Sequence, residues 1–141
     1  MSLLEVKDRV QKMLTEFVGS VRIDSDGDFG FTYESAVVYV RAFEWEDSIV
    51  LRIFSQFLRD VPLTPELYRW VATDGQDFLF GNTALVEFEN GIGRLDFGTY
   101  LLADYLDTEE LRTAVSAVAV TADRLDDELM ARFGGRRFLD D

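Results

Sequence analysis

The sequence predicts an α+β fold in which helices pack against one antiparallel sheet of five strands. Three observations support this prediction. Apolar residues recur every three or four positions near both ends of the chain, which is the period of an amphipathic helix. Between these segments the period changes to two, as in strands, and an Asn-Gly pair at 90–91 is typical of a tight turn between antiparallel strands. The expected order is helix, three strands, helix, two strands, helix.

The first helix is expected to begin after Ser2, because Ser2 and Glu5 have the spacing of a capping box. Gly19 is suited to end it. The apolar positions between them fall on one helical face: Leu3, Val6, Val10, Met13, Leu14 and Phe17.

The first strand is expected to run from Val21 to Tyr33, with the polar run 24–28 as a turn within it. The second and third strands are expected in "SAVVYVRAFE" and "SIVLRIFSQFL". Both of these segments are apolar at odd and even positions alike. Such strands are covered on both faces, so we expect a helix, another subunit or a ligand on each side.

The second helix is expected to be short, with Thr64 as its N-cap and Pro65 in its first position. Leu67 and Trp70 belong to its apolar stripe, and the pattern is broken by Gly75. The two strands that follow flank Asn90-Gly91. A two-residue turn there predicts a register that pairs Val86 with Leu95 and places Glu87 opposite Arg94.

The last helix is expected over about 108–133, with a second capping box at Asp107 and Glu110 and a stop at Gly134. At 1.5 Å per residue it would be roughly 39 Å long, which is longer than a small domain needs for its own packing. Its acidic run contains Asp123, Asp126, Asp127 and Glu128. We interpret that run as solvated surface of an amphipathic helix.

"DSDGDFG" at 24–30 resembles the start of a calcium-binding loop, since Asp24, Asp26 and Asp28 match ligand positions 1, 3 and 5. Phe29 stands where the loop needs glycine, and Ser35 stands where it needs the bidentate glutamate. We therefore interpret the segment as a turn between strands. Weak, adventitious cation binding by the three aspartates remains the alternative.

Composition limits the possible functions. The formal charge of −13 disfavours nucleic acid and anionic membrane surfaces as partners. The absence of cysteine and histidine removes disulfides, the usual zinc sites, thiol nucleophiles and histidine proton shuttles. We expect one cytoplasmic domain spanning residues 1–141, without a signal peptide, membrane span, metal or cofactor. No residue is nominated as catalytic.

The 12 phenylalanines are more than expected for a chain of this length. Most of them are expected to pack in the core, and the alternative is that some cover a surface that contacts a partner. Trp45 and Trp70 lie at or near the ends of expected elements, where tryptophan is often found in interfaces. We nominate Trp45, Leu67 and Trp70 as residues that contact a partner polypeptide or a second copy of the chain.

Several stretches together resemble the type III secretion chaperone-like fold, and in particular its YbjN-like branch. They are "DSDGDFGF" leading into "AVVYV", then "VPLTPELY", and "VAVTADRLDDELMARFGG". The resemblance implies a non-enzymatic, chaperone-like or regulatory protein, typically a homodimer, that holds an extended segment of a client polypeptide along apolar patches. The alternatives are a small enzyme that uses carboxylates in a pocket between sheet and helices, and a permanent structural subunit of a larger assembly.

Overall fold

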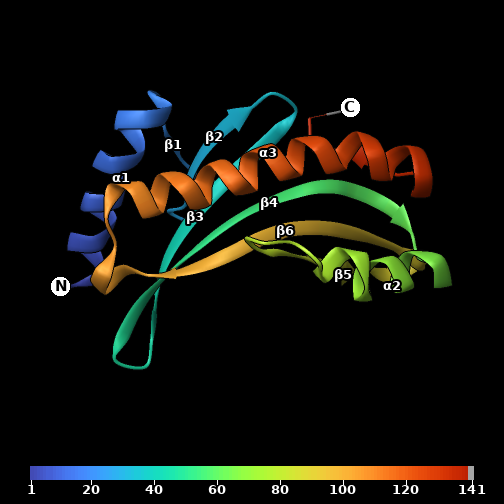
Figure 1. Ribbon diagram of the computed structural model, residues 1–141, viewed down its shortest axis with the longest axis horizontal. Coiled ribbons are helices and arrows are strands. Elements are labelled where there is room, and N and C mark those ends of the chain that lie inside the picture. Colours follow the sequence, from blue (N-terminus) through green and yellow to red (C-terminus); the bar gives the residue numbers. More distant parts are fainter. Residues whose placement is uncertain (140–141) are drawn as a thin grey trace.

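The computed structural model describes residues 1–139 and confirms an α+β fold with an antiparallel sheet and three helices (Figure 1). The sheet has seven strands in the order β1-β2-β3-β4-β6-β5, and β7 pairs with β4 outside this path. The elements in chain order are α1 Leu3–Val18, β1 Arg22–Ile23, β2 Phe29–Tyr33, β3 Ala36–Trp45, β4 Ser48–Pro62, α2 Pro65–Ala72, β5 Asn82–Glu87, β6 Ile92–Leu102, α3 Thr108–Phe133 and β7 Arg136–Arg137.

The prediction of five strands, and with it the expected element order, was wrong for two reasons. The aspartate-rich turn divides the first expected strand into β1 and β2, which pair with each other as a hairpin. After α3 the chain adds β7, a strand of two residues. A strand this short carries no alternation that a sequence pattern could reveal.

The helix ends are where the capping residues predicted them. The Ser2 and Glu5 side chains form the expected reciprocal capping box of α1. Thr64 accepts a hydrogen bond from the backbone N–H of Leu67 at the start of α2. Asp107 accepts one from the backbone N–H of Glu110 at the start of α3.

The register expected for the β5–β6 hairpin was wrong by one residue. Leu85 faces Leu95, Val86 faces Arg94 and Glu87 faces Gly93. The connection is not a two-residue turn but a short 3₁₀ segment, Glu89–Gly91, closed by a hydrogen bond from the N–H of Phe88 to the carbonyl of Ile92. Because side chains alternate along a strand, one extra turn residue changes every facing pair.

Helices α1 and α3 pack against the same side of the sheet, and α3 runs along the length of β4 and β6 (Figure 1). Helix α3 packs within its own chain along most of its length, since its buried residues extend from Leu111 to Leu129. Leu51, Ile53 and Phe97 form the facing part of the core and are almost completely buried.

The opposite side of the sheet, here called the outer face, is covered by side chains of the strands themselves. Phe54 is 3% exposed because the ring of Tyr39 stacks on it at 5.5 Å and the guanidinium of Arg52 lies 4.2 Å from its centre. Asp96 is buried on this face between Arg94 and Arg52, and the Arg94 Nε–Asp96 Oδ1 distance is 2.7 Å. The two-sided apolar pattern of β4 is thus satisfied partly by cation–π packing rather than by a second helical layer.

Candidate functional site

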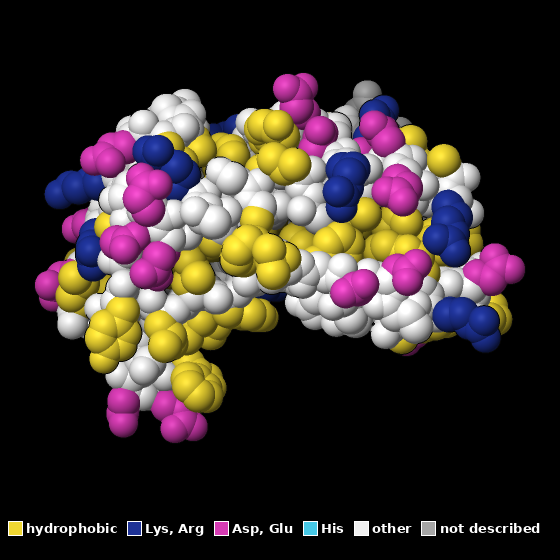
Figure 2. Space-filling view, in the orientation of Figure 1, with side chains coloured by type: hydrophobic (Ala, Val, Ile, Leu, Met, Phe, Trp, Pro, Cys, Tyr) yellow, Lys and Arg dark blue, Asp and Glu magenta, His cyan; other side chains and the backbone are white. Residues whose placement is uncertain are grey.

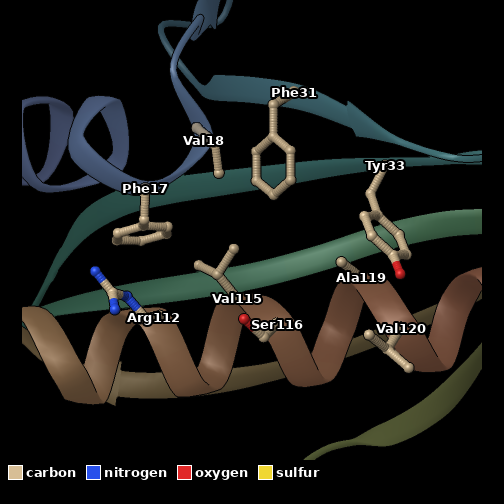
Figure 3. A pocket seen from close by; sticks show the side chains of 9 residues that line it. All are labelled: Phe17, Val18, Phe31, Tyr33, Arg112, Val115, Ser116, Ala119 and Val120. Carbon is tan, nitrogen blue, oxygen red and sulfur yellow. The ribbon is translucent and has the colours of Figure 1, made fainter.

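A groove of about 530 Å³ opens between the end of α1, strand β2 and the middle of α3 (Figure 3). Its volume lies within the range of ligand pockets in proteins. It is lined by Phe17, Val18, Phe31, Tyr33, Arg112, Val115, Ser116, Ala119 and Val120. Most of these side chains are apolar. We call this site the α1–β2–α3 groove.

The alternation of β2 places Phe29, Phe31 and Tyr33 on the side of the sheet that the helices cover. Their exposure rises along the strand from 4% to 8% to 40%, so the helical layer ends above β2. In Figure 3, Phe31 and Tyr33 project from β2 toward α3, and Phe17 lies at the opposite end of the groove from Tyr33. The groove is therefore a stretch of core that the helices do not completely cover.

Two short side chains on α3 leave the space open. Ser116 and Ala119 face the groove where a longer side chain would fill it, and Val115 forms part of its floor (Figure 3). The neighbouring Val120 is 52% exposed at the rim.

Arg112 is the charged residue of the groove. Its guanidinium carbon lies 5.5 Å from the ring centre of Phe17, and its Nη1 atom lies 3.6 Å from Oε1 of Glu109. The ion pair is exposed, so the contribution it makes to stability is small. The guanidinium thus remains accessible to a carboxylate or carbonyl group that enters the groove.

The edge of β2 beside the groove is open. Strand β1 pairs with β2 only at Phe29 and Gly30. From Phe31 to Tyr33 this edge has no partner strand within residues 1–139, although the side chain of Arg22 donates to the hydroxyl of Thr32 at 3.1 Å. An open edge next to an apolar groove is the geometry that accepts an added strand.

A second apolar surface lies where the β3–β4 hairpin projects from the molecule (Figure 1). Figure 2 shows hydrophobic side chains gathered over this projection, with acidic side chains at its tip. Trp45 is 58% exposed there, and Tyr100 and Leu102 of the adjacent β6 are 61% and 51% exposed. Of the three nominated contact residues, Trp45 is the one on the surface.

Leu67 and Trp70 lie elsewhere. Leu67 is completely buried in the core, and Trp70 is 6% exposed with its ring packed edge-on against Phe133 at 6.4 Å. One edge of Trp70 lines a polar hollow between α2 and Arg132. The structure therefore does not bring the three nominated residues together, and the sequence pattern did not identify the α1–β2–α3 groove.

The comparisons with known proteins agree with the fold. Residues 5–141 match the family model described as type III secretion (YopN, CesT) and YbjN peptide-binding chaperone 1. The chain belongs to this peptide-binding chaperone family. The resemblance inferred from the sequence is thereby confirmed. No curated protein sequence matches significantly.

Solved structures show that the fold of this chaperone family is shared at low sequence identity. The Yersinia pestis type III secretion chaperone SycH, solved with a stable fragment of YscM2, is 15% identical with a TM-score of 0.53, over 85% of this chain and 98% of that one. YbjN from E. coli is 10% identical to this chain with a TM-score of 0.61, and the match covers 87% of this chain and 92% of that one. The structure of the ExsC–ExsE complex matches with 16% identity and a TM-score of 0.56, over 86% of this chain and 93% of that one.

The aspartate-rich segment of this family member is a turn, as expected. One carboxylate oxygen of Asp24 accepts the backbone N–H groups of Asp26 and Asp28, both at 2.9 Å. The carboxylate of Asp28 is held by Arg41, with an Nη2–Oδ2 distance of 2.7 Å, and this bond raises the pKa of Arg41. Oxygens of the three aspartates lie within 4.8 Å of one another, and one oxygen of Asp24 and both oxygens of Asp28 are engaged in these bonds.

The interpretation of the acidic run on α3 as solvated surface was wrong for Asp126, which is 1% exposed. Its Oδ2 atom bonds the hydroxyl of Ser35, and the same hydroxyl lies 2.6 Å from Asp123 Oδ1. Burial raises the pKa of Asp126, and the Oδ1 atom of Asp126 has no hydrogen-bond partner within residues 1–139. These contacts fix the β2–β3 turn, and with it the Tyr33 end of the groove, to α3.

No helix in the described part of the chain is long and apolar enough to cross a membrane.

Proposed function

We propose that this chain is a non-enzymatic chaperone that holds an extended segment of a partner polypeptide in the α1–β2–α3 groove and acts as a homodimer in the cytoplasm. The observation that supports the proposal most is the coincidence of an apolar groove with the open edge of β2. Membership of the peptide-binding chaperone family supports the choice of a polypeptide as ligand.

The spacing of the groove fits a strand. Phe31 and Tyr33 are two residues apart on β2, so their side chains are separated by roughly 7 Å along the groove. A partner strand paired to the edge of β2 would present alternate side chains at the same interval. Main-chain hydrogen bonds would then supply affinity, and two successive apolar side chains entering the groove would supply specificity.

Charge selects among such segments. The chain carries a formal charge of −13, so a client with basic residues outside the apolar positions associates faster than an acidic one. This steering weakens as salt screens it.

A substitution that fills the groove tests the proposal. Ser116 is exposed on α3, so Ser116→Trp places a large ring in the groove without entering the core. Arg124→Trp adds the same ring at an exposed position of α3 outside the groove and serves as the control. The probe is a labelled peptide with apolar residues at alternate positions, flanked by lysines.

We expect Ser116→Trp to weaken binding of this peptide at least about tenfold, a loss of about 1.4 kcal/mol, with Arg124→Trp close to wild type. A peptide of the same composition with its apolar residues adjacent should bind more weakly to the wild type. Unchanged binding by folded Ser116→Trp would show that the groove is not the site.

For the homodimer we propose a contact through the projecting β3–β4 hairpin, where Trp45 is exposed, together with Tyr100 and Leu102 of β6, which are exposed on the same outer face of the sheet. Large exposed apolar residues of this kind are typical anchors of an interface. Sedimentation velocity of wild type and Trp45→Ser tests it. A wild-type dimer that Trp45→Ser converts to monomer supports the contact, and a dimer unaffected by the substitution contradicts it.

A further inference from the structure

Strand β4 is longer than the neighbour on one of its edges. On one side it pairs with β6 from Val50 to Pro62. On the other side its pairing with β3 ends at Phe54. Beyond that point the edge is closed by β7 through two residue pairs, Leu58 with Arg137 and Arg59 with Arg136. The segment after α3 thus fills a gap at the edge of the central strand.

The side chains of this segment contact both faces of the sheet in alternation. Arg136 forms an ion pair with Asp60, with an Nε–Oδ2 distance of 2.8 Å. Arg137 reaches in the other direction to Asp127 on α3, with an Nη1–Oδ1 distance of 3.1 Å. Phe138 then packs edge-on against Tyr39 of the outer face, with ring centres 6.3 Å apart.

These contacts are of a kind that can be exchanged. The carboxylates of Asp60 and Asp127 are 40% and 67% exposed, and ion pairs in water contribute little to stability. The segment is joined to α3 by Gly134 and Gly135, whose φ angles of +84° and +91° favour glycine. Gly135 also approaches β4 closely, because a Cβ there would lie 2.8 Å from the carbonyl oxygen of Arg59. The two glycines therefore allow the backbone to turn from the end of α3 onto the edge of β4.

We propose that the β4 edge at 56–60 is a second docking site for a partner polypeptide, and that Arg136–Phe138 is its internal occupant. The partner segment is extended and carries two successive basic residues followed by an aromatic one, because Arg136, Arg137 and Phe138 are the residues that occupy this edge in the structure. Asp60, Asp127 and the aromatic pair Tyr39–Phe54 are the groups that recognise it. The strong negative charge of the chain favours such a segment over an acidic one.

This site is separate from the α1–β2–α3 groove and does not depend on a client being bound there. The internal strand competes with any external one at an effective concentration that reaches the millimolar range for a short flexible link. A partner must displace it, so the segment reduces the apparent affinity of the edge for every external peptide.

The test uses the full chain and labelled synthetic peptides. The first peptide is GGRRFLDD, the second replaces Arg-Arg-Phe by Lys-Lys-Trp, and the third replaces Arg-Arg by Glu-Glu. The proteins are wild type, a variant with Arg136→Ser and Phe138→Ala, and the control Arg124→Ser, an exposed position outside the segment. Fluorescence anisotropy measures binding, and circular dichroism verifies that each protein is folded.

We expect the double variant to bind the first two peptides at least tenfold more tightly than wild type and Arg124→Ser, and to bind the Glu-Glu peptide poorly. The double variant that also carries Ser116→Trp should bind the first two peptides as tightly as the double variant alone. The result therefore distinguishes failure of the groove proposal from failure of the edge proposal. A folded double variant that binds no better than wild type overturns the proposal, as does equal binding of all three peptides. A dimer abolished by the double variant would identify a second copy exchanging this strand, and would also overturn it.

Discussion

Replacing Leu67 by alanine distinguishes a core residue from a contact residue. Leu67 is completely buried, and it belongs to the same core cluster as Trp70. Truncation to alanine removes three carbon atoms, which at about 0.8 kcal/mol each amounts to about 2.4 kcal/mol of lost transfer free energy. The cavity left behind adds to this, so we expect the free energy of unfolding to fall by about 3–4 kcal/mol.

The assay is equilibrium unfolding in urea followed by far-ultraviolet circular dichroism. The transition midpoint should fall while its slope stays constant, because the substitution changes stability and not the surface exposed on unfolding. Leu4→Ala is the matched control. Leu4 is 71% exposed on α1, so its truncation should change the free energy of unfolding by no more than about 0.5 kcal/mol.

The opposite result would refute this reasoning. If Leu67→Ala retained wild-type stability and instead lost partner binding, Leu67 would be a contact residue and α2 would not be docked on the core. The same variant series thus decides between the role nominated from the sequence and the position found in the structure.

Three further outcomes are expected. Burial raises the folded-state pKa of Asp126, so the carboxyl contributes stability that is fully present below its unfolded pKa of about 3.9 and is lost as pH rises through the folded value. Asp126→Asn should therefore gain stability relative to wild type as pH rises above about 4, measured by thermal unfolding, and a pH-independent difference would contradict this. Asp24→Ala removes the acceptor of two backbone N–H groups and should lower the free energy of unfolding by about 1–2 kcal/mol, whereas Asp26→Ala should lower it by less. Equal destabilisation by the two substitutions would contradict the view that the hydrogen bonds accepted by Asp24 are what stabilises the turn. The homodimer should become tighter in sedimentation as salt rises from low to physiological levels, since copies with a charge of −13 repel each other, and a weaker dimer would point to an interface held by ion pairs.

The sequence alone predicted the local features well. The ends of α1, α2 and α3 follow from Ser2, Thr64, Asp107 and the glycine after α3, because capping depends on residues within one turn of each other. The aspartate-rich turn was recognised for the same reason. The family was also indicated by the sequence, because its recurring stretches are local patterns of turns and apolar positions.

Features that depend on contacts between residues far apart in the sequence could be determined only from the tertiary structure. The burial of Asp126 depends on Ser35, which is 91 positions away, so the helical pattern alone placed it in solvent. The register predicted for the β5–β6 hairpin was wrong by one residue, because its turn contains one residue more than the two that were expected. Strand β7 pairs with the part of β4 that extends beyond β3. Its two residues are too few to show the alternation by which a strand is predicted from sequence.

The sequence by itself determined the helices, the antiparallel α+β class and the binding family, because each is encoded in contiguous residues. Only the tertiary structure decided which surfaces remain open. The α1–β2–α3 groove requires α1 to end at Val18 while Ser116 and Ala119 of α3 face β2, which brings together three segments far apart in the chain. Whether an apolar side chain is core or contact surface depends on what packs over it, and that is set by the arrangement of all elements together.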